Sequence, residues 1–228
     1  MNSIEDYIRE FSNEVSILTR TYFTLKSINV TASKDEKVLA ALNTSSATWS
    51  TILYSLQTTM FISLGRIFDI NDEAFSIHKL VKYCSEHIEE FDRVSLRGRK
   101  LHSNEQEPEW LEGYLNSAHY PKKEELLKLR GEVSKQSKIY KEKYQPIRHK
   151  LMAHTELAAI GNADILFAAT NIKELEEVIS FCNQIKLAIY GQYYNGRKIS
   201  LPGNVLFDFN DILDEDIKQL LELITSKA

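Results

Sequence analysis

The chain lacks the features that mark a membrane or secreted protein. No stretch reaches the roughly 18 consecutive apolar residues that a bilayer span requires. The N-terminus, MNSIEDYIRE, carries early acids instead of the basic and then apolar segment of a signal peptide. Only two cysteines occur, Cys84 and Cys182, and they form no CxxC pair, so we predict buried thiols instead of a disulfide framework. We therefore expect a cytoplasmic protein without a membrane partner.

The motifs of several enzyme classes are also missing. The sequence contains no Gly-rich phosphate loop, no serine elbow and no carboxylate pair of the glycosidase type. The spacings of His78, His87 and Glu90 form neither HExxH nor another convergent ligand set, and His102 and His119 are predicted in loops. We therefore predict no metal site and no cofactor.

Strand signals are nearly absent, whereas helical periodicity is strong. ILFAA and NVLFDF are the only short β-like runs, and no internal repeat is found. Apolar residues from Ile4 to Leu25 recur every three or four positions, which predicts one helix of about seven turns with Ser3 as its N-cap. The pattern predicts an all-α fold.

Further helices follow from the same periodicity. After a polar turn, NVTASKDE, they are predicted from Val38 to about Phe68, over SIHKLVKYCSEHI, from Lys122 to about Pro146, over NIKELEEVISFCNQIKLAIYGQYY with Asn171 as cap, and from about Asp211 to Thr225. The small hydroxyl residues in NTSSATWSTILYSLQTT predict a packed helix contact anchored by Trp49. Residues 92–121 read as a loop-rich insertion with short helices. We expect one domain over residues 1–228, a bundle of long antiparallel helices with this irregular connecting region.

Charge is unevenly distributed along the chain. The formal net charge is −4, yet the segment from Lys122 to Lys150 holds ten Lys and Arg against four Glu. This basic segment favours a partner that carries phosphate, and a solvated helix face with compensating acids is the alternative.

The basic segment leads into PIRHKLMAHTE, which contains Arg148, His149 and His154. Pro146 must end or kink the preceding helix, and it can begin the next one. Histidine suits proton transfer near neutral pH, and arginine suits the binding of phosphate oxygens. Metal-free cleavage of RNA needs both: a base for the 2′-OH, an acid for the leaving oxygen and positive charge at the phosphate.

Spacing alone does not establish such a site. Arg97 and His102 form a similar pair in RGRKLH, a stretch that looks irregular, and we interpret that pair as a coincidence. On a straight α-helix, Arg148 and His154 would point about 120° apart, so they would need local distortion or a second copy of the motif to converge. The second copy predicts a homodimer with a composite cleft across a two-fold axis.

The segment IRHKLMAHTE resembles the signature of the HEPN superfamily (higher eukaryotes and prokaryotes nucleotide-binding), in which a polar residue and then a histidine follow an arginine. It is similar to the AbiU-like, abortive-infection branch, as is SLGRIFD from Ser63 to Asp69. The resemblance implies a dimeric helical bundle and a metal-independent endoribonuclease that acts in toxin–antitoxin or phage-defence systems. Some toxin branches have a tyrosine where this chain has Glu156, so the resemblance does not extend to modification of that tyrosine.

These observations assign roles to particular residues. Arg148, His154 and His149 are the predicted catalytic residues, and Lys150, Lys143 and Arg66 are predicted to bind substrate. Arg66 can instead form an ion pair with Asp69, three positions along the helix. The expected partners are RNA, a second copy of the chain and an antitoxin or defence protein. Two alternatives stay open: a non-catalytic module that binds RNA, nucleotide or protein, and a purely structural bundle.

Overall fold

The fold is all-helical, as predicted. The computed structural model describes residues 3–101, 107–153, 163–168, 170–201 and 209–225, and this part of the chain contains helices and no β-strand. Residue 154 and its neighbours up to 162 lie outside the described ranges. The first four residues of the β-like run ILFAA, Ile165 to Ala168, are helical, because they belong to α9 (Ala163–Ala168).

The first helix, α1 (Ile4–Lys34), is longer than its apolar stripe predicts. Ser3 caps it as expected: the Asp6 amide donates to Ser3 Oγ (3.2 Å), and the Ser3 amide donates to Asp6 Oδ2 (3.0 Å). The predicted polar turn NVTASKDE is wrong over most of its length, since α1 continues through Lys34. Only Asp35 leaves the helical conformation, and its carboxylate caps α2 (Glu36–Thr44).

The predicted second long helix is two helices. Ser45 separates α2 from α3 (Ser46–Ile67) with φ −117° and ψ 45°. The stretch rich in small hydroxyl residues is also different from the prediction, because most residues of Ser46–Ser55 are exposed in the single chain. Trp49 is half-buried and packs against a small cluster that contains Val38 and Leu42.

The remaining helices agree with the sequence pattern. They are α4 (Ile77–Glu86), the 3₁₀ turn η1 (Ile88–Phe91), α5 (Arg93–Leu101), α6 (Trp110–Ser117), α7 (Lys123–Ile139), α10 (Ile172–Asn195) and α11 (Phe209–Thr225). Asn171 caps α10 as predicted, because its side chain accepts the Lys173 amide. Within residues 92–121, α5 and α6 pack on each other through Leu96, Leu111 and Leu115.

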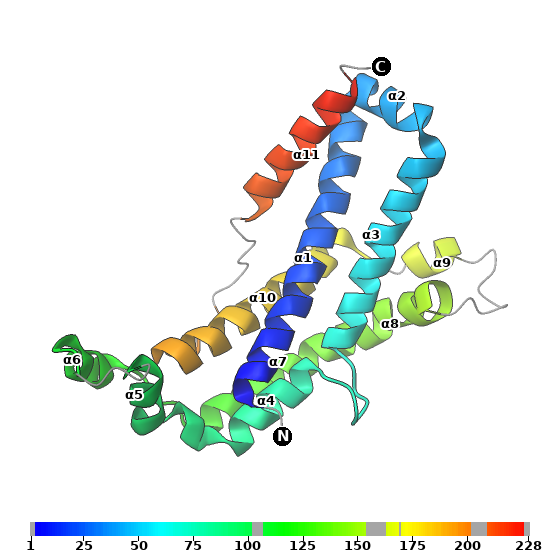
Figure 1. The fold of residues 1–228 in the computed structure, drawn as a ribbon. Coiled ribbons are helices and arrows are strands. Elements are labelled where there is room, and N and C mark those ends of the chain that lie inside the picture. The colour runs from blue at the N-terminus through cyan, green and yellow to red at the C-terminus, as the bar shows by residue number, and fades with distance from the viewer. Residues whose placement is uncertain (1–2, 102–106, 154–162, 169, 202–208, 226–228) are drawn as a thin grey trace.

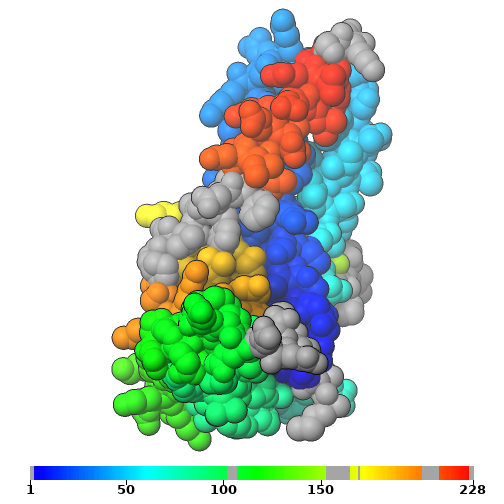
Figure 2. All heavy atoms as spheres, turned by 60° about the vertical axis from the view of Figure 1, so that its left-hand side comes forward, coloured from blue at the N-terminus to red at the C-terminus, as the bar shows by residue number. Residues whose placement is uncertain are grey.

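Helix α1 is the central helix of the molecule (Figure 1). α3 runs back antiparallel beside it, and α4, α10 and α11 also pack against α1, while α7 lies along α4. Figure 2 shows α5 and α6 at one end of the molecule and α11 at the other. The main core joins α1, α3, α4, α7 and α10, and both cysteines are buried in it as predicted. Burial raises the pKa of Cys84 to about 12, so its thiol is not reactive.

Candidate functional site

The segment around Arg148 is helical but widened. A π-helical turn, η2 (Tyr140–Tyr144), follows α7, then come α8 (Gln145–Ile147) and a second π-helix, η3 (Arg148–Ala153). Pro146 supplies a physical reason for the first widening, since its ring would clash with the carbonyl four residues earlier in a regular α-helix. The sequence-based rotation of 100° per residue therefore does not apply from Arg148 onward. π-Helical turns of this kind are frequent at functional sites.

Arg148 reaches across to α3 and lies on Gly65. A Cβ atom added to Gly65 would overlap both Cδ and Nε of Arg148, so no larger residue fits there without displacing the arginine. Gly65 belongs to SLGRIFD, and Arg148 belongs to IRHKLMAHTE. The fold thus brings together the two segments that carry the sequence resemblance.

His149 accompanies Arg148 at the surface. Arg148 Nη1 donates to His149 Nε2 across 3.1 Å, and because a guanidinium has no acceptor, that imidazole nitrogen must be unprotonated in this arrangement. The remaining proton of the neutral ring is then on Nδ1. His149 is exposed, whereas Arg148 is half-buried.

Both residues line a pocket of about 300 Å³, called here the Arg148 pocket. Segment 65–71, the end of α3 and the turn after it, forms one wall, and segment 137–149 forms the other. Arg148 and Lys141 are the cations of its lining, and Asp69 is its carboxylate. Asp69 Oδ1 accepts the Asn71 amide across 2.8 Å, which holds the turn.

Tyr140 lines the interior of this pocket, whereas the sequence predicts for it only a place in the helix from Lys122 to about Pro146. Its side chain is 3% exposed, and its ring stacks on Phe68 at 5.3 Å between centroids. Burial raises the pKa of Tyr140 to about 12, and the nearby positive charge of Arg148 opposes that rise. Gly65 was equally overlooked, although a glycine inside a helix is costly enough to signal a packing or functional reason.

The three predicted substrate-binding residues differ in their surroundings. Arg66 Nη1 pairs with Glu14 of α1 at 3.0 Å, so the predicted ion pair with Asp69 is wrong. Lys143 Nζ lies 2.6 Å from Glu174 of α10. Lys150 is half-buried and has no ion pair with a described residue. His154, the predicted acid or base, lies outside the described residues.

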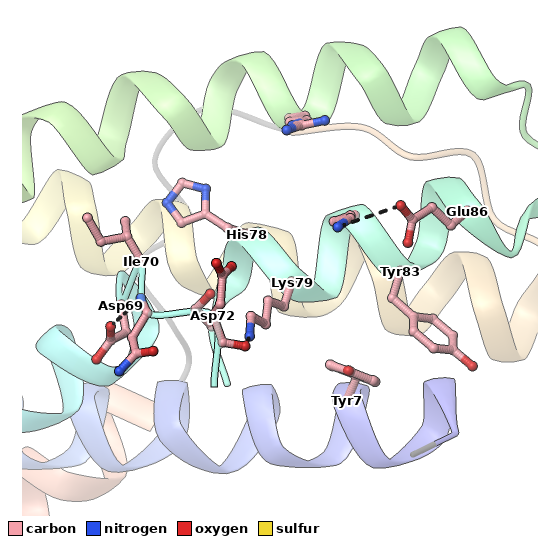
Figure 3. Close-up of a pocket in the computed structure, with 12 residues that line it drawn as sticks. Tyr7, Asp69, Ile70, Asp72, His78, Lys79, Tyr83 and Glu86 are labelled. Atoms are coloured by element: carbon pink, nitrogen blue, oxygen red, sulfur yellow. Dashed lines mark hydrogen bonds and ion pairs between the residues drawn. The ribbon is translucent and has the colours of Figure 1, made fainter. Parts of the chain in front are cut away.

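A second pocket of about 480 Å³ adjoins the first, and Asp69, Ile70 and Asn71 line both. His78 lies between α4 and α7 at this second pocket (Figure 3), and its Nε2 is 3.0 Å from Ser137 Oγ, which lines the Arg148 pocket. Cations and carboxylates both line the second pocket, Lys82 and Glu86 among them. Its charge therefore does not favour a phosphate ligand.

The described residues contain neither a cluster of metal-binding side chains nor a membrane-spanning helix. In that part of the chain, no group of three or more His, Cys, Asp or Glu side chains is placed to hold a metal ion. No helix described there combines the length and the apolar character needed to cross a membrane.

Comparison with known proteins gives one family. The family model of the HEPN type described as AbiU2 matches residues 1–223. No curated protein and no solved structure matches the chain. The match includes both Gly65 and Arg148 and covers nearly all of the sequence.

Proposed function

The chain belongs to the AbiU2 family of HEPN proteins, and we propose that it is a metal-independent endoribonuclease that acts as a toxin or phage-defence effector. The observation that carries this proposal is the position of Arg148. Its guanidinium is held over Gly65 at a pocket, beside an exposed imidazole. A fixed cation next to a group that can transfer protons is the minimum that metal-free phosphodiester cleavage requires.

The proposed reaction assigns roles to Arg148, His154 and His149. Arg148 binds the scissile phosphate and stabilises the charge that develops on its oxygens. His154 removes the proton from the 2′-OH or supplies one to the leaving 5′ oxygen. His149 positions the RNA or assists proton transfer, since its exposed ring lies beside Arg148.

A homodimer would complete the site by bringing two copies of the motif together. The exposed surface of α3 supports this part of the proposal. No charged residue occurs between Lys37 and Arg66, and Ile52 and Tyr54 are exposed on this uncharged surface. The centre of a protein interface is depleted of charged residues in the same way. The α3 surface also adjoins the motif, since Thr58 Oγ1 lies 3.5 Å from Met152 Sδ.

The test is cleavage of a mixed RNA pool by the purified protein in EDTA. We expect the wild type to cleave and Arg148→Ala and His154→Ala to lose about 10²–10³-fold in rate. Arg97→Ala is the matched control, because Arg97 also precedes a histidine closely but pairs with Glu112 of α6. Its rate should equal that of the wild type. Full activity in Arg148→Ala would refute the proposal, and RNA binding without cleavage by the wild type would favour the non-catalytic alternative.

A further inference from the structure

The second half of α10 and the turn after it carry no acidic residue. The chain as a whole holds 32 Asp and Glu and has a net charge of −4, yet neither residue type occurs from Val178 to Leu201. The same stretch contains three cations, Lys186, Arg197 and Lys198, and three tyrosines. None of these side chains lines the Arg148 pocket. A positive, tyrosine-rich region thus lies outside the site described above.

Tyr190 is exposed on the outer face of α10, and neighbouring rings support it. Tyr190 is 48% exposed, and its ring centroid lies 4.6 Å from that of Tyr194, about one helical turn further on. Tyr194 contacts the buried Tyr193 in turn, at 4.9 Å, and the Arg99 guanidinium lies 3.9 Å from the Tyr193 ring centroid. A ring held in this way offers a large contact area at a small cost in conformational entropy.

The turn that ends α10 folds two cations back over the helix. Gly196 ends the helix with a φ of +57°, and the amides of Gly196 and Arg197 donate to the carbonyls of Gln192 and Gly191. The Arg197 side chain therefore lies along α10: a Cβ atom added to Gly191 would be 3.5 Å from Arg197 Cδ. Arg197 and Lys198 are both exposed. Their charges are thus available at the outer face of the helix.

The two cations and the exposed ring belong to one surface. Arg197 and Lys198 line a pocket of about 160 Å³ together with Leu187, and among the described residues that line it there is no carboxylate. Leu187 is 49% exposed and lies three positions before Tyr190, so the two side chains are neighbours on the helix. Leu187, Tyr190, Arg197 and Lys198 are called here the α10 surface.

Glu125 and Glu5 are carboxylates near this surface, and each already has a protein partner. The bond from the Lys122 amide, 2.8 Å long, is the largest cause of the lowered pKa of Glu125, and the charge of Lys198 contributes least. Glu5 of α1 accepts the Tyr193 hydroxyl across 3.4 Å. Neither carboxylate lines the pocket, so Arg197 and Lys198 remain available to an anionic ligand.

An exposed ring beside cations is the arrangement that suits single-stranded nucleic acid. Unpaired bases stack on an aromatic side chain, and the phosphates of the same strand pair with Lys and Arg. A double helix keeps its bases stacked inside, so it would leave the Tyr190 ring without a base. Helix α10 starts beside the motif segment, where the Tyr144 hydroxyl donates to the Asn171 carbonyl across 3.3 Å. At 1.5 Å per residue, Tyr190 lies about 28 Å further along the helix.

We infer that the α10 surface is a second RNA-binding site, in which an unpaired base stacks on Tyr190 and the adjoining phosphates pair with Arg197 and Lys198. It holds a segment of the substrate away from the Arg148 pocket, at the other end of α10. The inference rests on the proposed function, because it takes RNA as the ligand.

Tyr190→Leu tests the stacking, and Tyr190→Phe is its conservative counterpart, since phenylalanine keeps the ring. Trp110→Leu is the matched control. Trp110 is also exposed, at 55%, and also contacts a ring four residues on, that of Tyr114, but Glu109 and Glu112 flank it. Affinity is measured with 2′-O-methyl RNA of about 20 nucleotides, which lacks the attacking hydroxyl and is longer than one single-strand site.

We expect Tyr190→Leu to bind this RNA about tenfold more weakly, as for the loss of one stacked base, and Tyr190→Phe and Trp110→Leu to bind like the wild type. The double variant Arg197→Gln/Lys198→Gln should reduce the slope of log affinity against log salt concentration by about 1.4, or 0.7 for each lost phosphate contact. Wild-type affinity in Tyr190→Leu, an equal loss in Trp110→Leu, or a loss accompanied by a lower melting temperature or by dissociation of a dimer would overturn the inference.

The cleavage assay reports separately on the proposed function. Tyr190→Leu should raise KM and leave kcat unchanged, whereas Arg148→Ala should lower kcat. In the Arg148→Ala background, Tyr190→Leu should weaken binding by the same factor as in the wild type, because the two sites are distant. A wild type that binds but does not cleave fails the proposed function, while the affinity of Tyr190→Leu still decides the role of the α10 surface. A wild type that does not bind RNA overturns both.

Discussion

The guanidinium arm of Arg148 lies directly on the backbone of Gly65. The two residues account for each other. A glycine inside α3 lowers the stability of the helix, and its missing side chain leaves the space that the Arg148 side chain occupies. This contact joins SLGRIFD and IRHKLMAHTE, the two segments that carry the sequence resemblance.

Gly65→Ala should therefore damage the site more than the fold. The added Cβ displaces Arg148, and a displacement of about 1 Å is enough to lower the rate of cleavage by about 10²-fold. Gly131→Ala in α7 is the matched control, because a Cβ there meets no atom within 4 Å. It should cleave normally and gain about 1 kcal/mol in the free energy of unfolding. Equal rates in the two variants would show that Arg148 does not depend on Gly65.

Arg66 is expected to stabilise the fold through Glu14. The Glu14 side chain is only 16% exposed, so removal of Arg66 leaves a poorly hydrated carboxylate. We expect Arg66→Ala to lower the free energy of unfolding by about 0.5–1 kcal/mol, and to have less effect when Glu14→Gln is already present. Denaturant unfolding of the wild type, the two single variants and the double variant measures the coupling between Arg66 and Glu14. A loss of RNA affinity in Arg66→Ala, with unchanged stability, would instead support its predicted role in substrate binding.

Lys150 should contribute to RNA binding, whereas Lys143 should contribute mainly to the stability of the fold. Lys150 has no ion pair with a described residue, so Lys150→Ala should weaken RNA binding without changing stability. In Lys150→Ala, the slope of log affinity against log salt concentration should be smaller in magnitude by about 0.7, the value for one lost phosphate contact. Lys143→Ala breaks the 2.6 Å pair with Glu174 and should mainly lower stability, by about 1 kcal/mol. RNA titrations at several salt concentrations and denaturant unfolding measure the two effects. Weaker RNA binding in Lys143→Ala together with lower stability in Lys150→Ala would contradict both assignments.

His78 should make stability depend on pH. Burial, helped by the charge of Arg130, holds the pKa of His78 below its ordinary value of 6.5 in the folded protein. As the pH falls below about 6.5, the unfolded chain takes up the proton first, so the free energy of unfolding decreases. His78→Gln can still bond to Ser137 and should show a smaller decrease between pH 7.5 and 5.5.

Urea unfolding of the wild type and His78→Gln at these two pH values measures the effect. The carboxylates of Asp6, Glu125 and Glu176 have lowered pKa values and contribute only in more acidic solution. Identical pH dependence in the two proteins would exclude His78 as its source.

Much of the fold could be predicted because helical signals are local. The spacing of apolar residues from Ile4 gave α1, and single caps such as Ser3 and Asn171 gave helix starts, since each depends on neighbours within one or two turns. Helix ends were less certain: the polar residues before Asp35 resemble a turn, yet packing of the α1 end against α2, α3 and α11 keeps them helical.

For the candidate site, the sequence could predict which types of residue take part but not how they contact one another. The sequence by itself determined that Arg148 and His149 stand together in a basic segment and that SLGRIFD lies near the end of a predicted helix. Only the tertiary structure decided that Arg148 lies on Gly65, that Tyr140 closes the pocket behind it and that Arg66 and Lys143 turn to Glu14 and Glu174. The physical reason is distance along the chain: helical periodicity repeats every few residues, whereas these contacts join segments that meet only when the whole core packs.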